Sequence, residues 1–221
     1  MVTGIGMTST RTRLRMVDRL RERGIQDEAV LSAIATVPRH IFVEEAMAHR
    51  AYEDTALPLG CSQTISQPYI VARMIELLRQ GREASLAGGL GKTLEIGAGC
   101  GYQAAVLGEL TDQVYAVERI EPLLNKAKAN LRQLQQFHVR LQYADGQLGL
   151  PAAAPFDSII VAAAAPRVPP ALLQQLALGG RMVLPVGSAE QQLHLVERTP
   201  QGFLETKLEG VRFVPLLSGV E

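Results

Sequence analysis

The sequence lacks tryptophan and has few aromatic residues of any kind. Phenylalanine, tyrosine and tryptophan together make up 5% of the 221 residues. Single-stranded nucleic acids bind on platforms of stacking side chains, and this chain has little material for one. Net charge is also absent, because 22 lysines and arginines balance 22 aspartates and glutamates. Without a basic excess to attract phosphate backbones, nucleic acid is not an expected partner.

Long apolar runs are missing too. The longest, residues 159–165, spans seven residues, whereas a membrane helix needs ~20. Residues 1–15 contain no apolar segment followed by a small-residue cleavage site, which is the pattern of a secretory signal. We therefore expect a cytoplasmic protein without a membrane partner.

Residues that form disulfides or bind metals are scarce. The two cysteines, Cys61 and Cys100, lack CxxC spacing, and free thiols are typical of a reducing cytosol. The four histidines are scattered, without HExxH or other ligand spacing. We expect neither a structural disulfide nor a metal site.

The length and the patterning predict one domain over residues 1–221. A chain of this size buries roughly 70% or more of its unfolded surface, which is enough for a single core. The pattern changes once along the chain. Residues 8–80 are mostly helical in pattern, whereas residues 92–221 alternate short strands with helices.

The N-terminal part is expected to contain helices and one loop. Residues 10–50 have helical spacing of apolar positions, with Asp27 as the candidate N-cap of a second helix. Residues 50–66 are polar and rich in turn residues, which predicts an ordered loop. Ser66 is the candidate N-cap of the next helix, and Pro68 lies in its first turn.

From residue 92 onward, strands and helices alternate. The expected strands are 93–96, 114–118, 139–143, 158–161 and 182–186, and the expected helices begin near 101 and span 122–134 and 169–180. Such alternation predicts a mostly parallel sheet with helices on both faces. Two further strands, 193–197 and 203–208, are separated by a turn, so we expect antiparallel strands to close one edge.

Three glycines lie between the first of these strands and its helix. Residues 94–102 read LEIGAGCGY, which gives an ExGxGxG pattern at Glu95, Gly97, Gly99 and Gly101. Glycine lets the main chain approach a ligand closely, and the helix start offers free N–H groups. A dinucleotide fingerprint would need its third glycine at position 102. The pattern instead resembles motif I of S-adenosyl-L-methionine-dependent methyltransferases, which have a Rossmann-like fold.

Acids at the ends of the next two strands support a cofactor site. Glu118 ends the second strand, where a carboxylate can accept both ribose hydroxyls in bonds of ~1.5 to 3 kcal/mol each. Asp145 and Gly146 follow the third strand, the place beside the adenine in such folds. Three features at successive strand ends predict bound S-adenosyl-L-methionine.

The segment upstream of the glycine loop indicates a particular family. Residues 63–69 read QTISQPY, and VPRHIFV at 37–43 and VRFVPL at 211–216 accompany it. With these motifs the chain resembles the protein-L-isoaspartate O-methyltransferase family from about Thr8 to Leu217. The resemblance implies Ser66 as the active-site residue, with Thr64 and Gln67 as further substrate contacts. It also implies that residues 50–66 and 211–216 help to form a groove for damaged, isoaspartyl-containing proteins and peptides.

The implied reaction explains why this segment contains no base. The acceptor is the α-carboxylate of an isoaspartyl residue, whose unperturbed pKa is roughly 3.5. Because it is ionised at pH 7, it can attack a sulfonium methyl group without losing a proton. Neutral hydroxyls at Ser66 and Thr64 can align it, and a helix N-terminus favours an anion. The resulting ester starts repair of the damaged residue, and we expect the enzyme to act as a monomer.

Two other interpretations remain open. The chain could methylate a nucleic acid or a small molecule, although amino-methylating enzymes of nucleic acids commonly carry Asn/Asp-Pro-Pro-Tyr/Phe where residues 161–166 read VAAAAP. Alternatively, it could be a binding or regulatory protein that keeps a cofactor pocket. Cofactor binding without turnover of isoaspartyl peptides would favour that second alternative.

Overall fold

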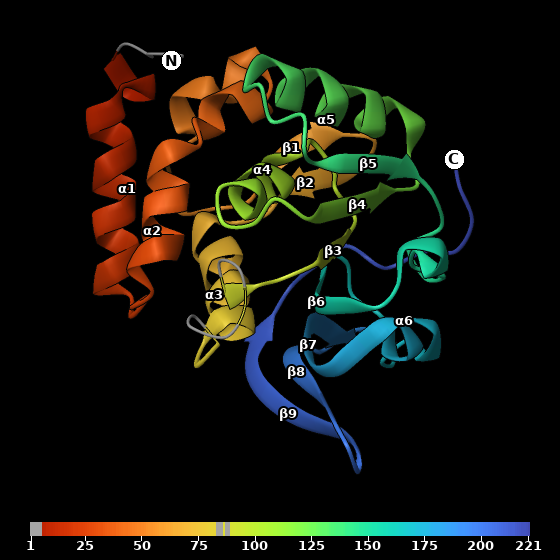
Figure 1. The fold of residues 1–221 in the computed structure, drawn as a ribbon. Helices are drawn as coiled ribbons and strands as arrows, with labels where there is room; N and C mark the ends of the chain where they lie inside the picture. The colour runs from red at the N-terminus through yellow and green to blue at the C-terminus, as the bar shows by residue number, and fades with distance from the viewer. Residues whose placement is uncertain (1–5, 83–85, 87–88) are drawn as a thin grey trace.

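The computed structural model describes residues 6–82, 86 and 89–221, and within them seven strands form one sheet in the order β5-β4-β3-β6-β7-β8-β9 (Figure 1). Parallel pairing joins the first five of these strands. They are β5 (Arg140–Tyr143), β4 (Val114–Glu118), β3 (Thr93–Ile96), β6 (Phe156–Val161) and β7 (Leu176–Gly187). The antiparallel strands β8 (Gln191–Thr199) and β9 (Gly202–Val211) extend one edge. The predicted mostly parallel sheet with antiparallel C-terminal strands is confirmed.

The strand order reverses beside β3. From β3 the chain adds β4 and β5 on one side, then returns to place β6 and β7 on the other. Ligands of such sheets bind outside the carboxyl ends of the strands at this switch point. All four residues of β3 are buried, as expected for a central parallel strand covered on both faces. The fold therefore marks the ends of β3, β4 and β6 as the place for a site.

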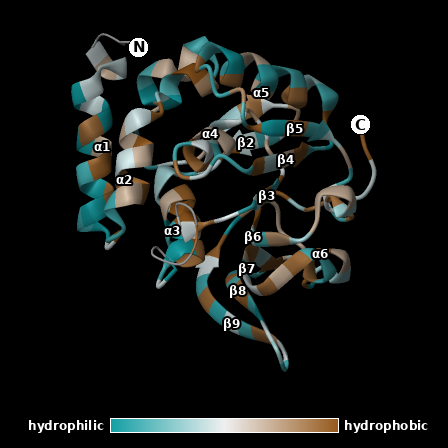
Figure 2. Cartoon of the chain, viewed as in Figure 1, coloured by the Kyte–Doolittle hydropathy of each residue, from teal (hydrophilic) through white to brown (hydrophobic). Residues whose placement is uncertain are grey.

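Helices cover both faces of the sheet. One buried cluster joins one face to the helices α1 (Thr10–Glu22), α2 (Glu28–Thr36), α3 (Pro68–Arg79), α4 (Tyr102–Gly108) and α5 (Glu121–Gln133). A second cluster joins the other face to α6 (Pro170–Gln175). Neighbouring residues of β6 divide between the clusters, with Ile160 in the first and Ile159 in the second, because successive strand side chains point to opposite faces. Figure 2 shows the hydrophilic and hydrophobic positions that alternate along α1.

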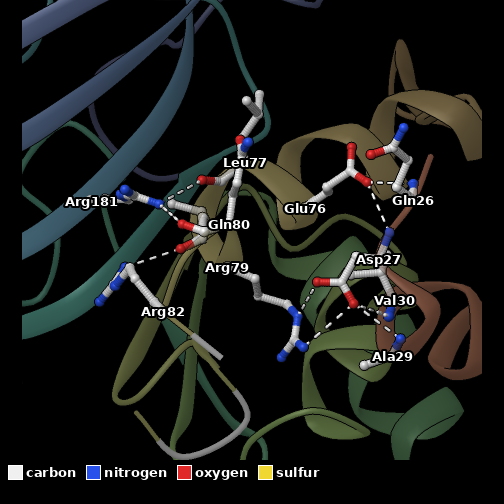
Figure 3. Close-up of polar contacts among 11 residues, drawn as sticks. Gln26, Asp27, Ala29, Val30, Glu76, Leu77, Arg79, Gln80, Arg82 and Arg181 are labelled. Carbon is white, nitrogen blue, oxygen red and sulfur yellow. Dashed lines mark hydrogen bonds and ion pairs between the residues drawn. The ribbon is translucent and has the colours of Figure 1, made fainter. Parts of the chain in front are cut away.

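Polar contacts fix α2 against α3. Asp27 is the N-cap of α2, as predicted, and its carboxylate accepts the N–H groups of Ala29 and Val30. The same carboxylate accepts from Arg79 Nε at 2.7 Å (Figure 3). Glu76 of α3 accepts the main-chain N–H groups of Gln26 and Asp27. Both partners of the Asp27–Arg79 pair are nearly buried, so the pair locks the two helices in one arrangement.

Three predicted features of the fold are wrong in detail. Ser66 is not the N-cap of α3, because the helix begins at Pro68 with Gln67 at the N-cap and no side-chain cap. The Tyr69 N–H donates instead to Asp54 Oδ1 at 2.9 Å. Pro68 has no N–H, so a distant carboxylate has taken the first free donor of the helix.

The predicted loop at residues 50–66 contains a short hairpin. Its strands are β1 (Leu57–Gly60) and β2 (Gln63–Ile65). The connecting residues Cys61 and Ser62 have φ of 49° and 55°, the left-handed conformations that a two-residue type I′ turn requires. Glycine and asparagine usually supply them, so Cys61 and Ser62 do not indicate a hairpin.

The helix predicted at 169–180 ends five residues earlier. Helix α6 stops at Gln175, and β7 begins at Leu176. Leu176 pairs with Phe156, but the next pair joins Arg181 to Ser158, so β7 carries extra residues in a bulge. Gly179 has φ of 75° within it, the conformation that glycine allows in a bulge.

The remaining elements are short. Short 3-10 helices occur at η1 (Gly6–Thr8), η2 (Arg39–Phe42), η3 (Glu45–Arg50) and η5 (Pro151–Ala153). In the described ranges, no helix is both long and apolar enough to cross a membrane. Nor does any cluster of His, Cys, Asp and Glu in those ranges have the arrangement of a metal site. Cys61 is exposed and Cys100 is buried, and both are free thiols.

Candidate active site

A cavity opens at the carboxyl ends of β3, β4 and β6, where the strand order reverses. Its polar wall includes Glu95, Glu118, Arg119 and Tyr102, and its apolar wall includes Ile96, Val117, Leu123 and Leu216. The main chain of the glycine loop, residues 97–100, forms another side. A mainly apolar pocket with a few polar groups is typical of a small-molecule site.

The three glycines of the loop have different structural roles. Gly97, Gly99 and Gly101 all have positive φ, at 85°, 56° and 86°, so each adopts a conformation that other residues rarely take. Gly97 and Gly99 line the cavity, whereas Gly101 does not. A Cβ at Gly101 would lie 3.2 Å from the Cβ of Ala127 in α5. Gly101 therefore lets the start of α4 pack closely against α5.

Glu118 holds the glycine loop. Its buried carboxylate accepts the Gly99 N–H at 2.8 Å and the N–H groups of Arg119 and Ile120 at 2.8 and 2.9 Å. The side chain also lines the cavity. Oε1 accepts both the Arg119 and the Ile120 N–H groups, which uses its two lone pairs, whereas Oε2 accepts only the Gly99 N–H and keeps a lone pair for a ligand hydroxyl.

Glu95 is fully buried on β3, and its Oε1 accepts from Gln103 of α4 at 3.0 Å. Burial raises the pKa of Glu95 well above its usual value; the bond from Gln103 lowers it by less, and the charge of Glu118 adds to the rise. Its Oε2 is buried without a partner in the described chain, whereas the buried Tyr102 hydroxyl interacts with the Arg39 guanidinium. Burial raises the pKa of Tyr102, and the interaction with Arg39 lowers it by less. Both residues line the cavity. Buried polar atoms left unpaired need a partner, and a polar ligand would supply one.

Asp145 and Gly146 differ in their position relative to the cavity. Gly146 lines the cavity, but Asp145 does not. The Asp145 carboxylate accepts the Gln147 N–H at 2.8 Å and the Gly219 N–H at 2.6 Å, so it is turned toward the C-terminal segment. A Cβ on Gly146 would lie 2.5 Å from Ile96 Cγ2, and only glycine fits there.

A groove adjoins the cavity. It is lined by residues 54–56, 64, 66–67 and 70, by the loop after β7, and by residues 210–217. Thr64 and Ser66 line both the cavity and the groove, as do Ala162 and Leu216. Neither hydroxyl has a hydrogen-bond partner within the part of the chain that the structure describes. The structure thus places two unengaged hydroxyls at the boundary between the two spaces.

Gln67 lies in the groove but is already engaged by its side chain. Its Nε2 donates to the Asp54 carbonyl at 2.9 Å. The carboxylate of Asp54 binds Tyr69 N–H and forms an ion pair with Arg23. Asp54 therefore already takes one of the N–H groups at the start of α3, where an anion site was expected.

Buried Arg39 holds the main chain at Ser66, and the sequence did not predict this role of Arg39. The side chain is fully buried, and its Nη2 donates to the Ser66 carbonyl at 2.7 Å while Nε donates to Ala51 at 2.9 Å. Its guanidinium carbon lies 4.8 Å from the centre of the Tyr102 ring. Burial lowers the pKa of Arg39, yet the guanidinium stays charged because arginine does not lose its proton in proteins. The VPRHIFV motif contains this residue, which was the available signal.

The C-terminal segment was also missed as part of the cavity. Leu216 and Leu217 line it, and residues 218–221 cross the ends of β4 and β5. Arg119 donates to the Gly219 carbonyl and to Glu221, both at 2.9 Å. Main-chain bonds join Glu221 to Arg119 and to Glu121. We call residues 216–221 the C-terminal strap.

Together, the sheet order, the glycine loop and the acid at the end of β4 define a Rossmann-like S-adenosyl-L-methionine-dependent methyltransferase. The unpartnered buried oxygen of Glu95 and the apolar walls suit a nucleoside joined to a charged amino-acid group. The cavity residues therefore fit this cofactor, and the predicted fold class is confirmed.

Comparisons with known proteins identify the family. The sequence profile of protein-L-isoaspartate(D-aspartate) O-methyltransferase matches residues 11–221. A protein-L-isoaspartate O-methyltransferase from Dechloromonas aromatica is 72% identical over 221 residues, covering 100% of both chains. One from an Azoarcus species is 64% identical and covers 96% of this chain and 95% of its own. This chain belongs to the protein-L-isoaspartate(D-aspartate) O-methyltransferase family, as its motifs predicted.

Solved structures agree with the fold. A protein-L-isoaspartate O-methyltransferase matches with a TM-score of 0.83 and 27% identity, over 94% of this chain and 67% of the other. A Plasmodium falciparum structure described as a putative member, in complex with S-adenosyl-L-homocysteine, matches with a TM-score of 0.76 and 23% identity. It covers 93% of this chain and 98% of the other, and it supports the fold.

Proposed function

We propose that this protein transfers a methyl group from S-adenosyl-L-methionine to the free α-carboxylate of L-isoaspartyl residues in damaged proteins and peptides. Family membership supports the reaction, and one geometric observation carries the assignment of the site. Ser66 and Thr64 present unengaged hydroxyls at the boundary of the cofactor cavity and the groove. An acceptor carboxylate bound there would lie between the cofactor cavity and the groove.

The site suits an acceptor that is already ionised. S-adenosyl-L-methionine supplies a methyl group activated by a sulfonium. A carboxylate with a pKa of roughly 3.5 carries no proton at pH 7, so no base is needed. Among the described residues that line the groove, the charged ones are Asp54, Glu190 and Arg212, and none is a histidine. What the chain supplies is alignment, which can lower a barrier by up to ~7 to 11 kcal/mol.

The residues assigned to the substrate have separate roles. We assign Ser66 as the catalytic residue, because its hydroxyl can donate to the carboxylate, and Thr64 as a second donor. The side-chain amide of Gln67 is bound to Asp54, so we assign Gln67 to the groove wall rather than to direct side-chain contact. Neutral donors suit the task, since a tighter clamp on the ground state would raise the barrier to transfer.

The residues assigned to the cofactor surround the cavity. Gly97, Gly99 and Gly146 would contact it through bare main chain, and Glu118 would accept from its ribose hydroxyls. Glu95 offers an unpaired oxygen. Gly101 and Asp145 would act indirectly, through packing on α5 and through the C-terminal strap.

A monomeric, single-domain enzyme of the cytoplasm fits these features. One chain lines both the cavity and the groove, and one buried cluster unites α1 to α3 with the sheet. The free thiols of Cys61 and Cys100 suit a reducing compartment. Light scattering during gel filtration tests the monomer, and a single unfolding transition that is coincident by two probes tests the single domain.

A labelling assay tests the activity. The protein is incubated with methyl-labelled S-adenosyl-L-methionine and one of two peptides that differ only in an isoaspartyl or a normal aspartyl linkage. We expect base-labile methyl ester on the isoaspartyl peptide alone. Label on both peptides would refute the selectivity, and bound cofactor without label on either would refute the proposed acceptor.

A further inference from the structure

Arg39 is a buried cation without a carboxylate partner in the described chain. Nε of Arg39 donates to the Ala51 carbonyl and Nη2 donates to the Ser66 carbonyl. Nη1 binds no carbonyl or carboxylate in the described chain, and the guanidinium interacts with the Tyr102 hydroxyl. Arginines are almost never fully buried unless they are paired, and burying an unpaired charge is costly. Because Arg39 contacts the Ser66 carbonyl, this buried charge lies next to the residue proposed to bind the acceptor.

The bond to the Ser66 carbonyl fixes a peptide group at the edge of the groove. The Ser66–Gln67 bond is trans, since the only cis bond in the described chain is Ala154–Pro155. In a trans peptide the C=O and the following N–H point in opposite directions. With the carbonyl held by buried Arg39, the Gln67 N–H points away from it. That N–H has no partner in the described chain, and Gln67 lines the groove.

The usual source of anion-binding donors, the helix N-terminus, is partly closed here. Pro68 has no N–H, and the Tyr69 N–H at the start of α3 is taken by Asp54. The donors left at the boundary among the described residues include the hydroxyls of Ser66 and Thr64 and the N–H of Gln67, with the Ile70 N–H one turn further along the groove. An ionised carboxylate has two oxygens, and the Ser66 hydroxyl with the next N–H offers one donor to each.

We propose that Arg39 is a positioning residue, which sets the Ser66–Gln67 peptide so that the Ser66 hydroxyl and the Gln67 N–H together receive the acceptor carboxylate. This inference rests on the proposed function and deepens it. A cation on the carbonyl polarises the peptide, which strengthens its N–H as a donor. The positive charge also acts through a buried medium of low dielectric, where charges attract over longer distances. The acceptor carboxylate thus binds neutral donors directly, while the buried charge of Arg39 attracts it from a greater distance.

Two substitutions test Arg39, with a matched buried arginine as the control. Arg39→Met removes the charge and the donors, and Arg39→Lys keeps the charge and one donor group. Arg79→Met removes another buried arginine, at the α2–α3 contact (Figure 3), and Arg79 does not line the groove. For each variant the assay measures kcat and KM for an isoaspartyl peptide, the Kd of S-adenosyl-L-homocysteine, and the unfolding temperature.

We expect Arg39→Met to raise KM for the peptide about ten- to hundredfold, the range for a lost hydrogen bond to a charged group. Arg39→Lys should recover part of this loss. The Kd of S-adenosyl-L-homocysteine should stay near that of the wild type, since Arg39 does not line the cavity. Arg79→Met should lower the unfolding temperature and leave KM unchanged. Equal KM in wild type and both Arg39 variants, or an equal rise in Arg79→Met, would overturn the proposal.

A measurement on the wild type keeps the test independent of folding defects. In nitrogen-15-labelled protein saturated with S-adenosyl-L-homocysteine, we expect the Gln67 amide proton to move downfield when the isoaspartyl peptide is added. The normal aspartyl peptide should leave it in place. A Gln67 signal that does not move, in an enzyme that methylates the peptide, would overturn the role of Arg39 alone. A wild type that methylates no isoaspartyl peptide would overturn the proposed function as well.

Discussion

The carboxylate of Glu118 and the main-chain N–H of Gly99 are joined by a hydrogen bond of 2.8 Å. The bond ties the end of β4 to the glycine loop after β3, so two motifs that are 19 residues apart form one wall of the cavity. Glu118 is therefore both a support of the loop and a candidate ribose acceptor.

Replacing this acid should weaken cofactor binding. Glu118→Gln keeps the shape of the side chain but removes its charge, and one of its atoms becomes a donor facing main-chain N–H groups. Charge-assisted bonds contribute ~1.5 to 3 kcal/mol, so we expect the Kd of S-adenosyl-L-homocysteine to rise about tenfold or more. Isothermal titration calorimetry measures it. The exposed Glu121→Gln is the control, and equal affinities of the two variants would refute the role of Glu118.

Removing the Ser66 hydroxyl should reduce activity without reducing stability. The hydroxyl caps no helix and binds no described group, so Ser66→Ala should leave the free energy of unfolding unchanged within about 0.5 kcal/mol. Loss of one bond to the acceptor carboxylate should lower kcat/KM for an isoaspartyl peptide about ten- to hundredfold. Urea unfolding and peptide kinetics check the two expectations. Ser32→Ala on the exposed face of α2 is the control, and a wild-type rate in Ser66→Ala would exclude the catalytic assignment.

Much of the fold could be predicted because its signals are local. Strands β3 and β4 have the predicted bounds, since each is a short segment rich in aliphatic residues that is followed by glycine or ends at an acid. The bulge between β6 and β7 is different, because it depends on how two distant segments pair. The hairpin turn at Cys61 and Ser62 depends on positive φ values. Cysteine and serine rarely adopt such values, so these residue types do not predict the turn.

The site could be predicted where one motif supplies it, and not where contacts cross the chain. The hydroxyls of Thr64 and Ser66 lie at the cavity as the motif implied. The sequence does not show that Asp54 takes the Tyr69 N–H, the first donor of α3, so that this donor is not available to a bound anion. Nor does it show that Asp145 turns toward Gly219, 74 residues away. These outcomes follow from tertiary packing, which decides between competing partners for one group.

The raised pKa of Glu95 should give stability a particular pH dependence. Its pKa in the folded chain lies well above the ordinary value of 4.5, chiefly because of burial. Above pH 4.5 the unfolded chain loses this proton while the folded chain retains it, so the group's contribution is full below that pH and is lost as the pH rises through the folded pKa. Glu95→Gln cannot ionise, and its oxygen can still accept from Gln103.

We therefore expect Glu95→Gln to gain stability over the wild type as the pH is raised. The difference in free energy of unfolding should be smallest near pH 4.5 and should grow toward pH 8. Urea denaturation of both proteins at several pH values measures this difference and cancels the titration of other groups. A difference that does not change with pH would mean that Glu95 has an ordinary pKa in the folded chain.

The C-terminal strap should contribute to cofactor affinity through residues that never touch the reacting groups. Deleting residues 218–221 removes the bonds of Arg119 to Gly219 and Glu221 and frees Asp145. Leu216 and Leu217 line the cavity, and they would lose the anchor that holds them there. Each net hydrogen bond contributes about 0.5 to 1.5 kcal/mol, so we expect the Kd of S-adenosyl-L-homocysteine to rise about three- to tenfold.

Arg119→Ala should reproduce part of this effect, whereas Arg132→Ala on the exposed face of α5 should not. Because Arg119, the main anchor of the strap, lines the cofactor cavity and not the groove, the peptide KM at saturating cofactor should change less than the cofactor Kd. Calorimetry with S-adenosyl-L-homocysteine and peptide kinetics separate these two quantities. An unchanged Kd in the truncated protein would show that Leu216 and Leu217 keep their positions in the cavity without residues 218–221. The bonds of Arg119 would then fix the chain end and contribute nothing to cofactor affinity.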